Sequence, residues 1–387
     1  MNIINSEVVS NKKILLRVDY NVDLDKEGKI LSDFRIRQSL ETIKFLLKKS
    51  KKIIIISHLG RPEGKDKKLS LEPIAKHLEK ILKHKIIFVD DCIGQRVKDT
   101  IDNSKETIFL LENLRFYKEE ENNDESFAKK LAELADVYVN DAFGVSHRLN
   151  ASVAAITKFL PSYIGFLMQK EIENLSKVKN NADHLFVIVL GGAKISTKLP
   201  LIKAFLDKAD YILLGGGLAN TIWKAWGFNV GKSLVEEKMI EEAKSLGSQK
   251  AELILPGDLV VASDFGAKES KVKEIGEIEN KDIIVDIGPI AAKTFANIIK
   301  NAKTVLWNGP MGYWENKEFR EGTKKIAKAI AQNKNFTVVG GGETLTVVED
   351  LKLLDKYDFV STGGGAMLDF LTSDDLPALK VLKQIHD

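Results

Sequence analysis

Short, continuous apolar runs alternate with segments of helical period along almost the whole chain. Such runs predict strands that are buried on both faces, and their alternation with helices predicts parallel sheets covered by helices. The predicted strands are ILLRVDY (14–20), KIIIIS (52–57), KIIFVD (85–90), TIFLLEN (107–113), DVYVND (136–141), FVIVLGG (186–192), YILLGGG (211–217), ELILPGD (252–258), TVLWNGP (304–310), FTVVGGG (336–342) and FVSTGGG (359–365). They are too many for one comfortable open sheet, so we expect two α/β lobes, with the division in the helical stretch 160–183.

Charge and composition exclude several classes of protein. The net charge of +3 arises from 58 basic and 55 acidic residues, so nothing global indicates nucleic acid or a membrane as a partner. Cys92 is the one cysteine, which rules out a disulfide framework and favours a reducing compartment. The N-terminal residues hold no apolar leader segment. We therefore expect a cytoplasmic protein.

The glycines are concentrated in the second half of the chain. Four clusters directly follow predicted strands: Gly191-Gly192, Gly215 to Gly217, Gly340 to Gly342 and Gly363 to Gly365. One cluster alone is explained equally well by a tight turn or close helix packing. Four clusters at equivalent strand ends, where parallel sheets bind ligands, predict a nucleotide site in this half.

The third cluster raises a question of charge. In FTVVGGGETL the glycines lead into a helix N-terminus, which favours an anion. The next side chain, however, is the Glu343 carboxylate, and no lysine follows as in a P-loop. A phosphate at this position needs a positive charge from elsewhere.

Strand ends in the first half carry basic and polar side chains instead. A single arginine at such a position is most often a solvated surface charge. Here lysine dominates the surface helices while arginine falls near the strand ends, which favours a site for a small, highly anionic molecule. The candidate residues are Asp19, Asn21, Arg35, Arg37, His58, Arg61, Asn113, Arg115, His147 and Arg148.

Two lysines follow the first glycine cluster in LGGAKISTKLPLI. If a helix begins there, Lys194 and Lys198 share one face, and an anion between them would offset their repulsion. Surface lysines at this spacing are common, but their place after a strand and two glycines favours a functional role.

Together these segments closely resemble the phosphoglycerate kinase family over essentially the full chain. The resemblance rests on RVDYNVD (17–23), SHLGRP (57–62), LENLRF (111–116), NDAFG with SHR (140–148), GGAKISTK (191–198), GGGLANT (215–221), GKSLVE (231–236), LPGD (255–258), DIGP (286–289), WNGPMG (307–312), GGGET (340–344) and STGGGA (361–366). It implies two Rossmann-like lobes, each a parallel sheet flanked by helices, joined by a hinge. Residues 1–165, with 372–387 returning to them, would bind 3-phosphoglycerate, and residues 166–371 would bind the nucleotide. A monomer is expected.

The resemblance also implies the roles of individual residues. The 3-phosphoglycerate contacts would be Asp19, Asn21, Arg35, His58, Arg61, Arg115 and Arg148. The nucleotide contacts would be Lys198, Gly215, Gly216, Gly217, Glu315, Gly341, Gly342, Glu343 and Thr344. Arg35 and Lys194 would be catalytic and flank the transferred phosphoryl group. The chain departs from the usual family pattern at Tyr20, Asp23, Ser146, Leu149 and Asn150, and at Glu343, where aspartate is usual.

The implied reaction is 1,3-bisphosphoglycerate + MgADP ⇌ 3-phosphoglycerate + MgATP. In the reverse direction the nucleophile is a carboxylate, so no general base is needed, and catalysis must come from alignment and charge neutralisation. Mg²⁺ beside Glu343, directly or through water, would supply the positive charge that a P-loop lysine supplies. Closure of the hinge is expected to exclude water.

Two other functions are compatible with parts of the sequence. A non-catalytic two-lobed sensor of a phosphorylated metabolite would need the basic site but not Lys194. An NAD-dependent dehydrogenase would share the strand and glycine pattern, but no G-x-G-x-x-G followed by a strand-end acid stands out.

Overall fold

The computed structural model describes residues 1–247, 251–373 and 376–384. The chain forms two compact units, residues 1–173 with 373–387 (unit 1) and residues 174–372 (unit 2). The sequence-based boundaries lie at 165/166 and 371/372, whereas the units divide at 173/174 and 372/373. None of the helices in the described part of the chain is both long and apolar enough to cross a membrane.

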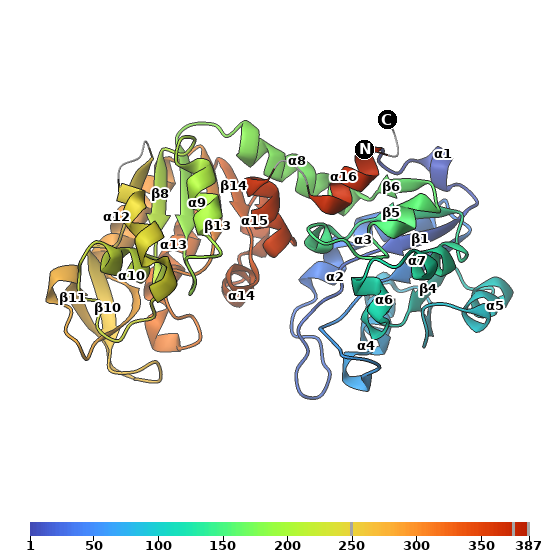
Figure 1. The fold of residues 1–387 in the computed structure, drawn as a ribbon, viewed down its shortest axis with the longest axis horizontal. Coiled ribbons are helices and arrows are strands. Elements are labelled where there is room, and N and C mark those ends of the chain that lie inside the picture. Colours follow the sequence, from blue (N-terminus) through green and yellow to red (C-terminus); the bar gives the residue numbers. More distant parts are fainter. Residues whose placement is uncertain (248–250, 374–375, 385–387) are drawn as a thin grey trace. The chain divides into compact units, whose positions relative to one another are not determined.

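Unit 1 is a six-stranded, wholly parallel sheet with the order β3-β4-β2-β1-β5-β6. Its strands are β1 (Lys13–Arg17), β2 (Lys52–Ile56), β3 (Ile86–Val89), β4 (Ile108–Leu111), β5 (Val137–Asn140) and β6 (Ser162–Ile164). Its helices are α1 (Ser6–Val9), α2 (Phe34–Gln38), α3 (Leu40–Leu47), α4 (Glu72–Leu82), α5 (Gln95–Asn103), α6 (Lys118–Glu121), α7 (Glu125–Ala132) and α16 (Pro377–Gln384). Figure 1 shows helices packed around this sheet.

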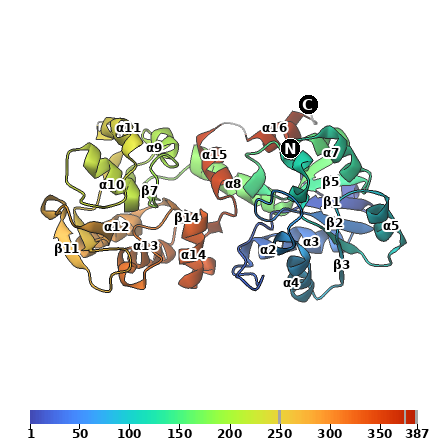
Figure 2. The same cartoon turned by 60° about the horizontal axis from the view of Figure 1, so that its bottom comes forward.

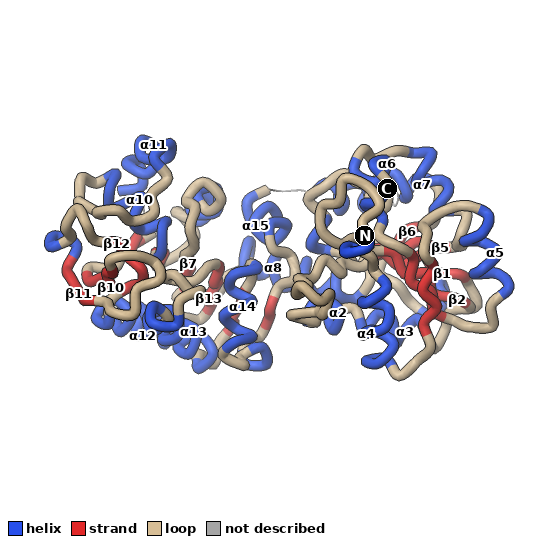
Figure 3. Tube along the Cα trace, turned by 90° about the horizontal axis from the view of Figure 1, so that it is seen from below, coloured by secondary structure: helices blue, strands red, loops and turns tan. Residues whose placement is uncertain are grey.

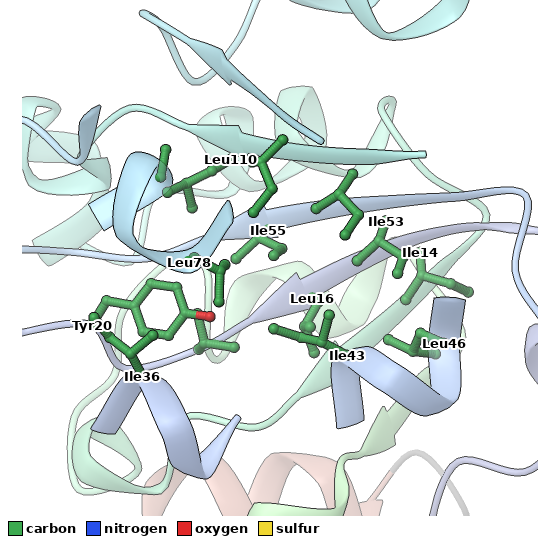
Figure 4. Close-up of a cluster of buried hydrophobic side chains, with 14 of the residues drawn as sticks. Ile14, Leu16, Tyr20, Ile36, Ile43, Leu46, Ile53, Ile55, Leu78 and Leu110 are labelled. Carbon is green, nitrogen blue, oxygen red and sulfur yellow. The ribbon is translucent and has the colours of Figure 1, made fainter. Parts of the chain in front are cut away.

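Side chains that alternate along the strands β1 to β5 of unit 1 enter two separate cores. Ile14 and Leu16 of β1 pack with α3 and α4 on one face, as Figure 4 shows. Leu15, between them, packs on the other face with residues of α5 and α7. Because both faces are buried, the strands β1 to β5 consist mainly of apolar residues, which explains why their sequences predict them.

The last described helix, α16, packs on unit 1 although it follows unit 2 in the sequence. Ala378 shares a small buried cluster with Ala142, Val145 and Val153, and its backbone N–H donates to the Ser146 carbonyl oxygen at 3.1 Å. Residues 374–375 and 385–387, which belong to the predicted returning segment, lie outside the described residues.

Unit 2 contains a second six-stranded parallel sheet, with the order β15-β14-β13-β7-β8-β9. Its strands are β7 (Phe186–Leu190), β8 (Tyr211–Leu214), β9 (Glu252–Ile254), β13 (Thr304–Asn308), β14 (Phe336–Val339) and β15 (Phe359–Val360). The helices are α9 (Leu199–Phe205), α10 (Gly216–Ala225), α11 (Ile240–Lys244), α12 (Pro289–Asn301), α13 (Glu321–Gln332), α14 (Gly342–Asp350) and α15 (Gly365–Thr372), and α8 (Phe166–Asn180) spans the division between the units. In Figure 2, α9 and α10 lie on one side of β7 and α12 and α13 on the other.

The predicted α/β class with two parallel sheets is confirmed, but the sequence missed some strands. A three-stranded antiparallel sheet, ordered β11-β10-β12, consists of β10 (Asp258–Ala262), β11 (Lys271–Glu274) and β12 (Ile283–Ile287). Figure 3 shows it set apart from β7 and β13. The predicted strand 252–258 is wrong in extent, because β9 ends before Pro256 and β10 begins at Asp258. The stretch 160–183 contains β6 before α8.

Candidate active site

Polar and basic side chains of unit 1 gather beyond the ends of four neighbouring strands. These strands are β4, β2, β1 and β5, which are adjacent in the sheet. The carboxyl ends of parallel strands meet at one edge, so residues far apart in the sequence come together there. The residues that follow these strands are Asp19 and Asn21 after β1, His58 and Arg61 after β2, Arg115 after β4 and Arg148 after β5.

Asp19 and Arg35 form the ion pair at the centre of this cluster. The Arg35 Nη1 atom lies 2.7 Å from Asp19 Oδ2, and the Asp19 side chain is only 4% exposed. Burial alone would raise the pKa of Asp19, but the charge of Arg35, a hydrogen bond from the Asn21 N–H and the charge of Arg17 outweigh it and hold the pKa below its usual value. Asp19 therefore stays ionised and fixes the Arg35 guanidinium.

The loop after β2 is held by two other residues of the predicted site. The Gly60 N–H donates to Asn21 Oδ1 at 2.8 Å, and Arg115 Nη1 donates to the Gly60 carbonyl oxygen at 2.7 Å. Gly60 has φ +63°, a left-handed backbone conformation that residues other than glycine rarely adopt. Arg61, the next residue, is exposed, and no hydrogen bond or ion pair joins it to another described residue.

The positive charges of the cluster exceed the negative charges beside them. Burial, followed by repulsion from Arg148, lowers the pKa of Arg115, and Glu121 at 3.3 Å offsets this in part. The Arg148 Nε atom donates to the neighbouring His147 rather than to a carboxylate. Guanidinium groups placed together in this way fit a small molecule with several negative charges.

A buried network behind this cluster was not predicted from the sequence. Arg17, at the end of β1, is 1% exposed, and its Nε atom donates to Ser152 Oγ at 2.9 Å. Glu120 accepts from the Ser152 N–H and hydroxyl at 2.9 and 2.6 Å and lies 3.8 Å from Arg17 Nη2. The one sequence signal that could have indicated this network was the position of Arg17 inside the apolar run ILLRVD.

In unit 2, the predicted lysines and the third glycine cluster line one cavity of about 390 Å³. The residues that line it include Lys194, Lys198, Asn308, Gly341, Gly342, Glu343 and Thr344. The cavity lies beyond β7, β13 and β14, which are adjacent in the sheet. The structure therefore brings together two segments about 150 residues apart, as ligand binding at strand ends requires.

The two lysines do not share a helix face, so that prediction is wrong. Helix α9 begins only at Leu199, and Lys194 lies in the preceding loop, where it is exposed. Lys198 is half-buried and contacts Asn308 Oδ1. Burial lowers the pKa of Lys198 to about 8, and the Glu343 carboxylate counteracts only part of this shift.

Glu236 holds the loop that carries both lysines. Its carboxylate accepts hydrogen bonds from the Ser196 N–H at 2.9 Å and the Ser196 hydroxyl at 2.6 Å. Its own N–H donates to Thr221 Oγ1 at 3.1 Å, and that hydroxyl donates to the Gly217 carbonyl oxygen at 2.8 Å. The lysine loop is thereby tied to the second glycine cluster.

The glycines allow these turns to pack closely against each other. A Cβ atom on Gly191 would lie 1.9 Å from the Pro310 carbonyl oxygen, and one on Gly217 would lie 2.5 Å from the Ala193 carbonyl oxygen. Gly341 precedes α14 with φ +102°. Thr344 is fully buried, and its hydroxyl accepts from the Gly309 N–H at 2.6 Å, so it fixes the turn after β13.

A second cavity, of about 520 Å³, adjoins the first. Gly192, Ala193 and Glu343 line both, while Gly216, Gly217 and Glu315 line only the second. Its walls include the apolar side chains of Leu234, Leu259, Phe265, Ile284, Ile287, Met311 and Tyr313. Gly215 is not among the lining residues, because it packs against Met311. An apolar cavity beside a charged one fits a ligand with a flat base and a phosphate tail.

Glu343 is the exposed carboxylate that the two cavities share. No group of three or more His, Cys, Asp or Glu side chains within the described residues could hold a metal ion by itself. One carboxylate suits Mg²⁺, which keeps several waters and is commonly bound by one or two carboxylates together with substrate phosphates.

An arginine cluster on one α/β unit and a lysine- and glycine-lined double cavity on the other fit a phosphotransferase. The family model for phosphoglycerate kinase matches residues 4–374. The chain belongs to the phosphoglycerate kinase family. It is accordingly a kinase whose phosphoryl acceptor is a carboxyl group.

Relatives and solved structures agree over nearly the full length. The chain is 46% identical to phosphoglycerate kinase of Dictyoglomus turgidum, covering 98% of each chain. It is also 46% identical to the cytosolic phosphoglycerate kinase of Triticum aestivum, covering 97% of this chain and 96% of the relative. The phosphoglycerate kinase structure from Pyrococcus horikoshii matches with a TM-score of 0.89 at 32% identity, covering 99% of this chain and 98% of that one. The structure from Coxiella burnetii matches with a TM-score of 0.85 at 36% identity, covering 98% of each chain.

Proposed function

We propose that unit 1 binds 3-phosphoglycerate and that unit 2 binds MgATP or MgADP for reversible phosphoryl transfer to the carboxylate of the sugar acid. The observation that carries this assignment is the cavity in which Lys194, Lys198 and Glu343 meet beyond three strand ends. The excess of guanidinium groups at the strand ends of unit 1 supports the placement of the anionic acceptor there. The expected setting is a cytoplasmic monomer.

The residues of unit 1 that bind the acceptor are proposed from their positions. Arg115 and Arg148 carry charges that few acids beside them offset, so they suit the phosphate. Asn21 and Arg115 both form hydrogen bonds with Gly60, and the exposed Arg61 is the next residue in the sequence. Arg35, which Asp19 holds in place, and His58 complete the site.

The nucleotide is assigned to the two cavities of unit 2. Gly216, Gly217 and Glu315 line the apolar cavity and would bind the nucleoside, with Gly215 supporting the turn. Lys198, Gly341 and Gly342 line the charged cavity and would bind phosphates, while Thr344 shapes that cavity. Glu343 would hold Mg²⁺, directly or through water, and the metal would neutralise phosphate charge.

Charge neutralisation supplies the catalysis in this proposal. The attacking carboxylate is already ionised at neutral pH, so no base has to remove a proton. Arg35 and Lys194 would neutralise the phosphoryl group during transfer. A pair of unit charges 4 Å apart is worth about 4 kcal/mol at an effective dielectric constant near 20, and each 1.4 kcal/mol changes the rate tenfold.

The decisive experiment traps the acyl phosphate. Incubation with ATP, Mg²⁺, 3-phosphoglycerate and hydroxylamine should yield a hydroxamate with the wild type and very little with Lys194→Ala. Lys203→Ala is the matched control, because Lys203 is an exposed lysine of the same unit that pairs with Glu242. Equal yields from Lys194→Ala and the control would refute the role of Lys194. Binding of both ligands without any hydroxamate in the wild type would favour a sensor.

Because each substrate is assigned to a different unit, the reaction requires the units to approach each other when both ligands are bound. Small-angle scattering with both ligands should therefore show a smaller radius of gyration than with either alone. An unchanged radius would contradict hinge closure while leaving the two binding sites intact.

A further inference from the structure

His58 and Arg17 face each other in the interior of unit 1. The Arg17 Nη2 atom lies 3.2 Å from His58 Nδ1, and the two residues are 1% and 2% exposed. A guanidinium group has five N–H donors and no acceptor, and it stays charged. The contact is therefore a hydrogen bond only if Nδ1 carries a lone pair. A proton on Nδ1 would place two donors against each other in a buried site.

Arg17 is fixed so firmly that it cannot turn away from His58. Its Nε atom donates to Ser152 Oγ, and its Nη1 atom donates to the Val18 carbonyl oxygen. Glu120, itself buried, balances the charge at 3.8 Å from Nη2. Because every part of the guanidinium has a partner, its orientation toward His58 is set before any ligand binds.

We propose that Arg17 is a positioning residue that holds His58 as the neutral tautomer with its proton on Nε2. In this form His58 presents a single N–H donor on the side of the ring away from Arg17. No hydrogen bond joins Nε2 to another described residue. That donor would serve the anionic acceptor, an inference that depends on the assignment of 3-phosphoglycerate to unit 1.

The surroundings of His58 support a neutral ring. Burial, together with the positive charges of Arg17, Arg115 and Arg35, depresses its pKa well below the ordinary value, although Asp19 counteracts them. An imidazolium would also have to place its Nδ1 proton against the guanidinium of Arg17. A neutral donor adds no further charge to a site that already contains several arginines.

The tautomer is measured directly by ¹⁵N NMR of the whole, ligand-free protein labelled at histidine. His58→Gln assigns the resonances. The wild type should show a protonated Nε2 and an unprotonated Nδ1 for His58 between pH 6 and 8. In the double variant Arg17→Met/Glu120→Gln, which removes both buried charges together, the Nδ1–H tautomer should become populated. Ser152→Ala keeps Arg17 and should retain the wild-type tautomer.

A wild-type His58 with its proton on Nδ1 would overturn the proposal, and so would an unchanged tautomer in a folded double variant. The wild-type spectrum decides the question even if the double variant does not fold. A kinetic measurement then tests the link to the substrate. The double variant should raise KM for 3-phosphoglycerate about tenfold, with a smaller change in KM for ATP. If the wild type has the predicted tautomer but His58→Gln binds 3-phosphoglycerate as tightly as the wild type does, the contact between His58 and the substrate is refuted. The role of Arg17 in holding the tautomer would then still stand.

Discussion

Both donors of Ser196 are bound by one carboxylate, that of Glu236, across 40 positions of sequence. These hydrogen bonds lower the pKa of Glu236, so its ionised form is favoured at neutral pH. The contact fixes the middle of the loop that carries Lys194 and Lys198. Restraint of a flexible lysine before the ligand arrives reduces the entropy lost on binding.

Glu236→Gln should therefore slow phosphoryl transfer. The amide oxygen can accept from one Ser196 donor, but the amide NH2 group can only donate to the hydroxyl, so the charge assistance is lost. Loss of a charge-assisted hydrogen bond costs about 1.5–3 kcal/mol, or roughly tenfold or more in kcat/KM. Steady-state kinetics would measure the change. Glu237→Gln is the control, because Glu237 is exposed and pairs with Lys224. A double-mutant cycle with Ser196→Ala that shows no coupling would contradict this role.

Nucleotide affinity should fall as the pH rises through about 8. At that pH the half-buried ammonium of Lys198 loses its proton, and a phosphate binds the charged form better. Above this pKa Lys198 has to take up a proton when the nucleotide binds, which weakens affinity by up to about tenfold per pH unit. Calorimetric titration of the protein with ADP at pH values from 6.5 to 9.5 would measure this decline in affinity. The decline should disappear in Lys198→Met and persist in Lys203→Met.

Glu343→Gln should raise the Mg²⁺ concentration needed for half-maximal activity. Glu343 is the exposed carboxylate shared by both cavities, and an amide is a weaker ligand for a hard cation. Glu343→Asp, the usual family residue, should retain the wild-type requirement more closely. Activity is titrated with Mg²⁺ at fixed nucleotide, with Glu318→Gln as an exposed control. Identical titration curves for the wild type and Glu343→Gln would exclude a metal-binding role.

Arg35→Gln should reduce kcat about a hundredfold or more, because one of the two proposed neutralising cations is lost. It should also raise the pKa of Asp19, since burial would no longer be opposed by its largest favourable partner. Arg37 offers a matched control on the same helix, where it pairs with Asp33 at 2.8 Å and its side chain is 56% exposed. If Arg37→Gln and Arg35→Gln were equally active, Arg35 would have no part in catalysis.

The sequence predicted the parallel sheets because most of their strands are buried on both faces and consist mainly of apolar residues. In the antiparallel sheet, β11, KVKE, was missed because it is exposed or half-exposed along its length and lacks an apolar pattern. The other two strands, DLVVA and IIVDI, are largely buried apolar runs that the sequence analysis did not recognise as strands. The prediction that Lys194 and Lys198 lie on one helix was wrong, because the periodicity of LGGAKISTKLPLI does not reveal that the helix begins at Leu199.

The local motifs placed the charged side chains near strand ends, but not the contacts between them. Arg17 and Ser152 are 135 positions apart, and no pattern in either segment specifies that they meet. Glu236 lies within GKSLVE, yet its bond to Ser196 depends on how that segment folds over the lysine loop. Such contacts arise from tertiary packing, which sequence patterns within one element cannot specify.

The position of α16 also has a consequence for synthesis on the ribosome. Ala378 covers the small patch of Ala142, Val145 and Val153, but it is translated after the whole of unit 2. At 5–20 residues per second, unit 2 takes roughly 10–40 s to emerge. Through that interval, unit 1 must persist with the patch uncovered. Unit 2, which is continuous in sequence, can complete its own contacts before unit 1 does, although it is translated later.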